Sequence, residues 1–136
     1  MIDVLLIEDN DDDIELSRRS FEKAGLLAHL RVARDGEDAL DYLFGRGAYA
    51  SQGVASSIQL VLLDLNLPQM PGLEVLRQIR MNKETRALPV VVLTISRQEP
   101  DLLQGFTMGI SDYLIKPIDQ GRFSKMYKKY VKAVSA

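Results

Sequence analysis

Five polar residues follow directly after apolar runs, in four segments that lie far apart along the chain. They are Glu8, Asp9, Asp64, Thr94 and Lys116. Three carboxylates brought close together repel one another, by roughly a few kcal/mol for each close pair at an effective dielectric of about 20. One lysine does not neutralise three carboxylates. These residue types therefore predict a site for a hard divalent cation such as Mg²⁺, which prefers oxygen ligands.

A divalent cation, a lysine and a hydroxyl grouped around one carboxylate are the parts of a phosphoryl-transfer site. In this interpretation Asp64 is the nucleophile that forms an aspartyl-phosphate. Thr94 and Lys116 contact two of the transferred phosphoryl oxygens, and the metal contacts the third. Each residue alone has a plainer explanation: a helix-start acid, a turn residue, a threonine of no special role or a surface lysine. Their shared position after apolar runs favours the chemical interpretation.

Short apolar runs and amphipathic segments alternate along the chain. Strands are predicted at residues 1–7, near Leu30 and Val32, and at 60–63, 89–93 and 113–115. Helices are predicted at 12–24, after an N-cap at Asp35, at 73–80, from Pro100, and at 123–134, whereas residues 48–57 are predicted to form a loop. Such alternation predicts an α/β fold with a parallel sheet covered on both faces. Its strand ends meet at one edge, where ligands bind.

The predicted core faces of the helices follow from the spacing of their apolar residues. They comprise Ile14 and Phe21; Ala39, Leu40, Leu43 and Phe44; Val75, Leu76 and Ile79; Leu102, Leu103 and Phe106; and Phe123, Met126, Tyr127, Tyr130, Val131 and Val134. The last set is large for a terminal helix. It therefore suggests a surplus apolar face that forms a homodimer.

The charges are unevenly distributed, although the net charge is only -2. Seven of the 19 acids lie in the first 15 residues, and five bases but no acid follow Asp119. We interpret Asp11, Asp12 and Asp13 as a solvated helix start favoured by the helix dipole, not as ligands. The net charge gives no electrostatic case for nucleic-acid binding. His29 is the only histidine, and we expect it to be structural or exposed.

Several classes of protein are excluded by what the sequence lacks. There is no cysteine, hence no disulfide framework and no thiolate zinc site. No apolar run approaches about 18 residues and no secretory signal is present, so we expect a cytoplasmic protein without a membrane span. The patterns G-x-x-x-x-G-K-[ST] and G-x-G-x-x-G are absent, which argues against a nucleotide-binding module. We expect residues 1–136 to form one domain.

Four segments, LLIEDN (5–10), LLDLNLP (62–68), PVVVLT (89–94) and DYLIKP (112–117), resemble the response-regulator receiver domains of two-component systems in order and spacing. The resemblance implies a flavodoxin-like, CheY-like (βα)5 fold, a doubly wound five-stranded parallel sheet of order 2-1-3-4-5. It also implies that Asp64 is the phospho-acceptor. Mg²⁺ or Mn²⁺ would be held by Glu8, Asp9, Asp64 and the backbone carbonyl of Asn66.

Further roles follow from the same resemblance. Thr94 is the switch hydroxyl, Lys116 the phosphate-binding amine, and Tyr113 the coupled switch aromatic, unless it is simply a core residue. The Lys116-Pro117 bond is expected to be cis. Phosphorylation would draw Thr94 inward, let Tyr113 turn into the space it leaves, and shift the population of the surface formed by the fourth helix, fifth strand and fifth helix. Ile95 stands where the family mostly has a small residue, so we expect slower autodephosphorylation.

The expected partners are a sensor histidine kinase and, as an onward acceptor, a histidine phosphotransfer protein. The long segment 46–57, with LDLNLP and VVVLT, resembles single-domain regulators paired with bacterial and cyanobacterial phytochrome kinases in red and far-red light signalling. We expect no output domain and no enzymatic activity beyond self-catalysed phosphorylation and dephosphorylation. One alternative is a receiver fragment of a larger regulator or hybrid kinase. Another is a dehalogenase-type phosphatase, but its general acid position is occupied by Asn66.

Overall fold

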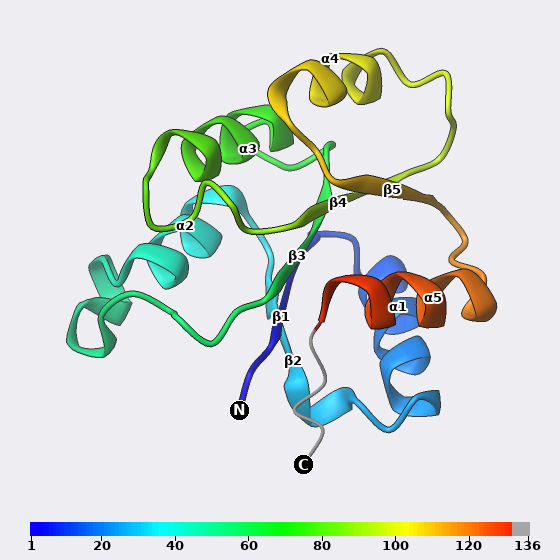
Figure 1. Cartoon of the computed structure of the whole chain (residues 1–136), viewed down its shortest axis with the longest axis horizontal. Coiled ribbons are helices and arrows are strands. Elements are labelled where there is room, and N and C mark those ends of the chain that lie inside the picture. The colour runs from blue at the N-terminus through cyan, green and yellow to red at the C-terminus, as the bar shows by residue number, and fades with distance from the viewer. Residues whose placement is uncertain (132–136) are drawn as a thin grey trace.

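The structure, a computed structural model, describes residues 1–131 and contains one five-stranded sheet (Figure 1). All strand pairs are parallel, and the order is β2-β1-β3-β4-β5. The strands are β1 (Val4–Ile7), β2 (Leu30–Ala33), β3 (Leu60–Asp64), β4 (Val90–Thr94) and β5 (Asp112–Ile115). The predicted fold class and strand order are therefore confirmed. The first strand begins at Val4, three residues later than predicted.

Five α-helices cover the two faces of this sheet (Figure 1). They are α1 (Asp11–Lys23), α2 (Gly36–Phe44), α3 (Gly72–Met81), α4 (Pro100–Met108) and α5 (Gln120–Tyr130). Helices α1 and α5 pack on one face, and α2, α3 and α4 on the other. Two short 3-10 segments, η1 (Leu27–His29) and η2 (Gly47–Gln52), complete the described chain.

The sheet divides the core into two apolar clusters. Leu5 and Ile7 of β1 face the cluster formed with α2, α3 and α4, whereas Val4 and Leu6 face the cluster formed with α1 and α5. This split follows from strand geometry, because successive side chains point to opposite faces. Both faces are covered, so β1, β3 and β4 are buried along their whole length and have apolar sequences without alternation.

Side-chain caps fix where three of the helices begin. Asn10, Asp35 and Asp119 each accept a hydrogen bond from the backbone N–H three residues later. The predicted N-cap at Asp35 is thereby confirmed. Because Asn10 caps α1, only three residues separate the end of β1 from the start of this helix. Its first turn therefore lies beside the strand ends.

The helical core faces agree with the predictions except at α4. Leu102 is buried, but Leu103 and Phe106 are 64% and 49% exposed. The inward position is taken by Gly105, where an added Cβ would lie 3.2 Å from Ile110 Cγ2. Because Gly105 is the α4 residue that faces the core at this position, Leu103 and Phe106 remain largely exposed to solvent. The prediction that Leu103 and Phe106 belong to the core was wrong.

The apolar stripe of α5 is used within this chain. Phe123, Met126 and Tyr127 are buried, as is Val131 directly after the helix. Phe21 of α1 stacks edge-on against Phe123 with ring centroids 4.8 Å apart. Val134 lies outside the described residues. Tyr130 is partly buried against the same cluster, so the α5 stripe as far as Val131 packs within this chain and leaves no large apolar side chain exposed.

The segment predicted as a plain loop contains η2, which is tied back to β2 and α2. The guanidinium of Arg31 lies 4.4 Å from the ring centroid of Tyr42 and 5.1 Å from that of Tyr49. Arg31 also donates a hydrogen bond to the Tyr49 hydroxyl, which in turn donates to Asp38. These contacts fix the position of a polar segment. Because the segment has no apolar periodicity, its structure cannot be predicted from the pattern of the sequence.

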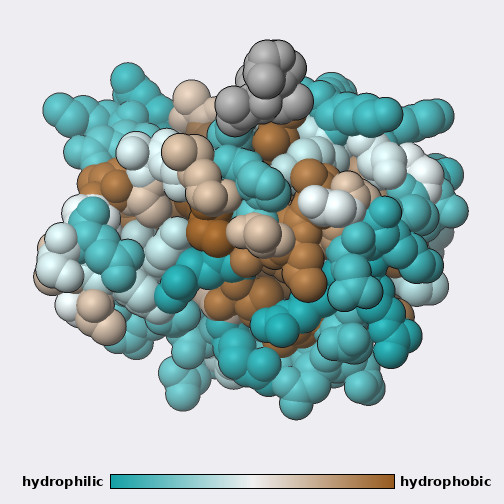
Figure 2. Space-filling view, turned by 90° about the horizontal axis from the view of Figure 1, so that it is seen from below, coloured by the Kyte–Doolittle hydropathy of each residue, from teal (hydrophilic) through white to brown (hydrophobic). Residues whose placement is uncertain are grey.

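The surface combines hydrophilic and apolar regions. Figure 2 shows the side on which the N-terminus lies in Figure 1; apolar side chains gather in its centre and hydrophilic ones surround them. Within residues 1–131, none of the helices has the length and apolar character needed to span a membrane.

Candidate functional site

The carboxyl ends of β3, β4 and β5 form one edge of a cavity of about 250 Å³. The strand register brings Asp64 beside Leu93 and Thr94 beside Ile115, so the residues that follow each strand end at nearly the same level. The cavity is lined by Asp9, Asn10, Asp13, Asp64, Asn66, Leu93, Thr94, Ile95 and Lys116. A larger cavity, of about 690 Å³, lies at the carboxyl ends of α2 and α3.

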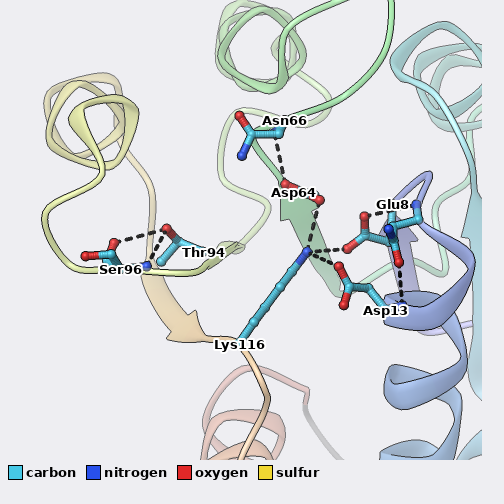
Figure 3. A network of polar contacts seen from close by, with 8 residues as sticks. Glu8, Asp13, Asp64, Asn66, Thr94, Ser96 and Lys116 are labelled. Atoms are coloured by element: carbon cyan, nitrogen blue, oxygen red, sulfur yellow. Dashed lines mark hydrogen bonds and ion pairs between the residues drawn. The ribbon is translucent and has the colours of Figure 1, made fainter.

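Lys116 lies at the centre of the site, and its side chain reaches from the end of β5 toward three carboxylates (Figure 3). Its ammonium nitrogen is 2.7 Å from Glu8 Oε1, 2.8 Å from Asp13 Oδ2 and 3.0 Å from Asp64 Oδ2. The lysine side chain is 14% exposed, and that of Glu8 is fully buried. The expected cis bond between Lys116 and Pro117 is present.

The two carboxylates at the ends of β1 and β3 are also held by backbone groups. Asp64 Oδ1 accepts a hydrogen bond of 2.9 Å from the backbone N–H of Asn66. Glu8 Oε2 accepts one of 3.3 Å from the backbone N–H of Asn10. In each carboxylate, one oxygen thus accepts a hydrogen bond from Lys116, and the other accepts one from the backbone two residues further along the chain. This arrangement fixes both groups in orientation.

Burial and charge shift the ionisation of the central groups. Burial, reinforced by the interaction with Asp64 and opposed by Lys116, raises the pKa of Glu8 from 4.5 to about 7. Burial alone would lower the pKa of Lys116, but its hydrogen bonds to Asp13, Glu8 and Asp64 raise that pKa above its usual range. The lysine is therefore a permanent cation in this site.

The carboxylates that converge most closely are Glu8, Asp13 and Asp64, with one oxygen of each within 4.8 Å of the others. This is a set of hard oxygen donors with excess negative charge, which fits a divalent cation such as Mg²⁺. Asp9 and the exposed Asn66 were predicted as ligands, and both line the same cavity. Asp9, however, is not a member of the converging group.

Asp13 is the site residue that sequence reasoning missed. The sequence suggested only a solvated helix start, which holds for the exposed Asp11 and Asp12 but is wrong for Asp13. A signal was available. Ser17 and Ser20 lie four and seven residues further along α1 and are buried, so small polar residues mark the side of the helix that begins with Asp13.

Thr94 and Tyr113 lie beside the carboxylate cluster and not within it. The Thr94 hydroxyl donates to the backbone carbonyl of Ser96 at 3.1 Å and accepts from the Ser96 N–H at 3.3 Å. Figure 3 shows Thr94 across the cavity from Glu8 and Asp13, directed toward its own loop. The ring of Tyr113 is half-buried and contacts Phe106 of α4.

The comparisons with known proteins agree with this geometry. Residues 4–128 match the response regulator receiver domain. Over 115 residues the chain is 43% identical to the probable methanogenesis regulatory protein FilR2 of Methanothrix harundinacea (strain 6Ac), covering 85% of this chain and 72% of that protein. Over 113 residues it is 35% identical to the response regulator Rcp1 of Synechocystis sp. (strain ATCC 27184 / PCC 6803 / Kazusa), covering 83% and 75% respectively.

Solved structures give the same result. The bacteriophytochrome response regulator AtBRR matches with a TM-score of 0.83 and 37% identity, over 100% of this chain and 99% of that one. The Mn(2+)-bound form of Rcp1 matches with a TM-score of 0.75 and 32% identity, over 95% and 91%. Together with the strand order and the four polar strand ends, these matches show that the chain belongs to the response regulator receiver domain family of two-component systems.

Proposed function

We propose that this chain accepts a phosphoryl group from a sensor histidine kinase on the carboxylate of Asp64. The observation that carries the proposal is the position of Asp64. Its side chain is 9% exposed, lines an open cavity at the end of a central strand and lies 3.0 Å from the Lys116 ammonium. In the transfer, an Asp64 oxygen bonds to phosphorus, the phosphorus–nitrogen bond of the donor breaks, and the imidazole leaves.

Lys116 and the converging carboxylates supply the electrostatic part of this chemistry. The lysine can move from the Asp64 oxygen to a phosphoryl oxygen without leaving the cavity, because it already lies within hydrogen-bond distance of that carboxylate. We propose that Mg²⁺ or Mn²⁺ is held by Glu8 and Asp64, with Asp9 and the Asn66 carbonyl as further ligands. A bound divalent cation would neutralise charge on the phosphoryl oxygens.

The output of phosphorylation is proposed to be a shift of the surface formed by α4, β5 and α5. The Thr94 hydroxyl bonds with the Ser96 backbone, and we take this as its arrangement before phosphorylation. A phosphoryl group on Asp64 competes for that hydroxyl. It changes the population of the surface only to the extent that it binds the alternative arrangement more tightly.

The proposed partner is a phytochrome-type histidine kinase, because AtBRR, which matches the whole of this chain, is by name a bacteriophytochrome response regulator. Leu103 and Phe106 of α4, with 64% and 49% exposure, provide apolar surface for a partner or a second copy. We propose dimerisation through this α4 side of the surface and not through the α5 stripe.

Phosphotransfer tests the function directly. Wild-type protein and Asp64→Asn are incubated with Mg²⁺ and acetyl phosphate, and separately with a radiolabelled phytochrome kinase or an unrelated histidine kinase. Intact mass and label are then measured. We expect one phosphoryl group on wild type, none on Asp64→Asn, and faster transfer from the phytochrome kinase. Label on Asp64→Asn, or none on wild type from any donor, would overturn the assignment. Equal rates from both kinases would remove the phytochrome partner.

A further inference from the structure

We propose that Asp13 is a dedicated positioning residue for Lys116, which holds the lysine ammonium in the site while its other partners change. This inference rests on the proposed phosphorylation of Asp64. It gives a role to a residue outside the polar strand ends, because Asp13 belongs to the first turn of α1.

The lysine ammonium has no hydrogen-bonding capacity to spare. An ammonium group has three N–H donors, and the three carboxylates at 2.7, 2.8 and 3.0 Å use all of them. A phosphoryl oxygen can therefore reach Lys116 only by replacing one of these partners. The Asp64 oxygen is the partner replaced, because Asp64 itself carries the new group.

Glu8 is a second partner that can leave Lys116. Glu8 is fully buried and belongs with Asp64 to the carboxylates proposed to hold a divalent cation. When a cation draws these two groups, Asp13 is the remaining carboxylate on Lys116. The Asp13 backbone is itself fixed, because its N–H donates a 3.0 Å hydrogen bond to the capping side chain of Asn10.

The charges of the cluster also favour the pairing of Asp13 with Lys116. Glu8, Asp13 and Asp64 with Lys116 would sum to two negative charges when all are ionised. If Asp13 pairs with Lys116, the carboxylates of Glu8 and Asp64, with Asp9 in the same cavity, remain for the divalent cation. If Asp13 were instead a metal ligand, the lysine would have to find another partner in a cavity where it is 14% exposed. The pairing of Asp13 with Lys116 gives the lysine ammonium a carboxylate partner and leaves Glu8 and Asp64 for the divalent cation.

The test uses matched variants on one helical turn. Asp13→Asn removes the charge at the lysine, Asp13→Glu restores it, and Asp12→Asn makes the same change at an exposed neighbour. Each change is also made in a Lys116→Met background. Four quantities are measured: the phosphorylation rate with acetyl phosphate, Mg²⁺ affinity followed by NMR, the free energy of unfolding in urea, and the motion of the Lys116 ammonium in metal-free protein by nitrogen-15 relaxation.

We expect Asp13→Asn to slow phosphorylation by about tenfold, which corresponds to about 1.36 kcal/mol of lost transition-state stabilisation. The effect should vanish in the Lys116→Met background and be largely restored by Asp13→Glu. The ammonium of Lys116 should become more mobile. Mg²⁺ affinity should change by no more than about threefold, as for a partly exposed charge in a high dielectric.

Other outcomes overturn the proposal. A loss of Mg²⁺ affinity of at least about tenfold in both backgrounds would make Asp13 a metal ligand or a support for one. Equal effects of Asp13→Asn and Asp12→Asn would reduce its role to charge at a helix start. An unchanged Lys116 ammonium would contradict positioning. Failure of wild type to be phosphorylated would instead refute the proposed function, and the ammonium measurement would still decide whether Asp13 restrains Lys116.

Discussion

The ring of Phe106 stands edge-on against the ring of Tyr113, with centroids 5.9 Å apart and ring planes at 89°. This contact joins α4 to β5 across the surface proposed to change on phosphorylation. Phe106 is 49% exposed, so its contribution to stability comes mainly from this one ring pair and not from deep burial. We expect this pair to hold the half-buried Tyr113 in its observed orientation.

Phe106→Ala should therefore lower the free energy of unfolding by about 1 kcal/mol, the size of an aromatic pair. Leu103→Ala is the control, because Leu103 lies on the same helix and is 64% exposed. Urea unfolding measures both, and NMR of the Tyr113 ring reports its surroundings. If the two variants lose the same stability and the Tyr113 signals do not move, the ring contact has no restraining role.

Thr94 should couple the phosphoryl group to α4 through its hydroxyl, which now bonds with Ser96. Thr94→Ser keeps the hydroxyl, whereas Thr94→Ala removes it. With beryllofluoride and Mg²⁺ as a phosphoryl mimic, wild type and Thr94→Ser should show backbone chemical-shift changes in α4 and β5. Thr94→Ala should bind the mimic with smaller changes there. Full changes in the alanine variant would exclude the hydroxyl as the coupling group.

The raised pKa of Glu8 predicts opposite pH dependences with and without metal. In metal-free protein the folded-state pKa of about 7 lies above the ordinary value of 4.5, so the folded chain binds this proton more tightly. The resulting stability is fully present below about pH 4.5 and is lost as pH rises through about 7. The pKa difference corresponds to a contribution of the order of 3 kcal/mol.

Divalent-metal binding should show the reverse trend, because a proton on Glu8 must leave before the carboxylate can bind. Mg²⁺ affinity should fall by up to about tenfold for each pH unit below the pKa. Urea unfolding in EDTA and Mg²⁺ titrations from about pH 5.5 to about 8.5 measure both trends. Glu8→Gln should remove the part that the Glu8 carboxyl contributes to the pH dependence of stability and to the pH dependence of Mg²⁺ affinity. A Glu8→Gln variant with the same pH profiles as wild type would refute it.

Ile95 should restrict access of water to the phosphoryl group. Its side chain is 70% exposed and lines the cavity that contains Asp64. Ile95→Ala should speed loss of the phosphoryl group, by less than about tenfold because only one wall of the cavity is opened. Ile95→Val serves as the intermediate case. Decay of phosphorylated protein, followed by intact mass, gives the rates, and an alanine variant no faster than wild type would contradict the prediction.

Much of the fold follows from the sequence because the buried strands carry a simple signal. Residues in β1, β3 and β4 are apolar without alternation, and each run stops at a polar residue. In a parallel sheet those stops must lie at one edge, so the meeting of Glu8, Asp64 and Lys116 could be predicted without knowing any helix position.

Asp13 and Phe106 could not be placed in this way. The direction of Asp13 depends on the rotation of α1, which is set by the Asn10 cap and by packing against the sheet, and only the spacing of Ser17 and Ser20 distinguishes Asp13 from its two acidic neighbours. Phe106 has the spacing of a core residue. Its exposure accompanies the inward position of Gly105, which faces Ile110 just after the helix and Leu73 of α3, and helical periodicity does not contain these contacts.

Tyr49 should contribute to stability through its hydroxyl, which accepts from Arg31 at 2.9 Å and donates to Asp38 at 2.8 Å. Tyr49→Phe keeps the ring but removes one hydrogen bond from Arg31 and one from Asp38. Because the network involves charged groups, we expect a loss of about 1–3 kcal/mol in the free energy of unfolding. Urea unfolding measures it, with Tyr130→Phe as the control, because this change removes a single exposed hydrogen bond, to the Ser111 carbonyl. Equal losses in both variants would refute the anchoring role.

The segment anchored by Tyr49 also offers a way to sort related sequences. A Cβ on Gly45 would lie 2.3 Å from the backbone carbon of Gly53, and both glycines have positive φ angles. A chain with side chains at both positions cannot close the segment in this manner. Sequences that combine these two glycines with Arg31 and Tyr49 should therefore share this loop, so four positions are enough to group uncharacterised genes by the path of the chain between α2 and β3.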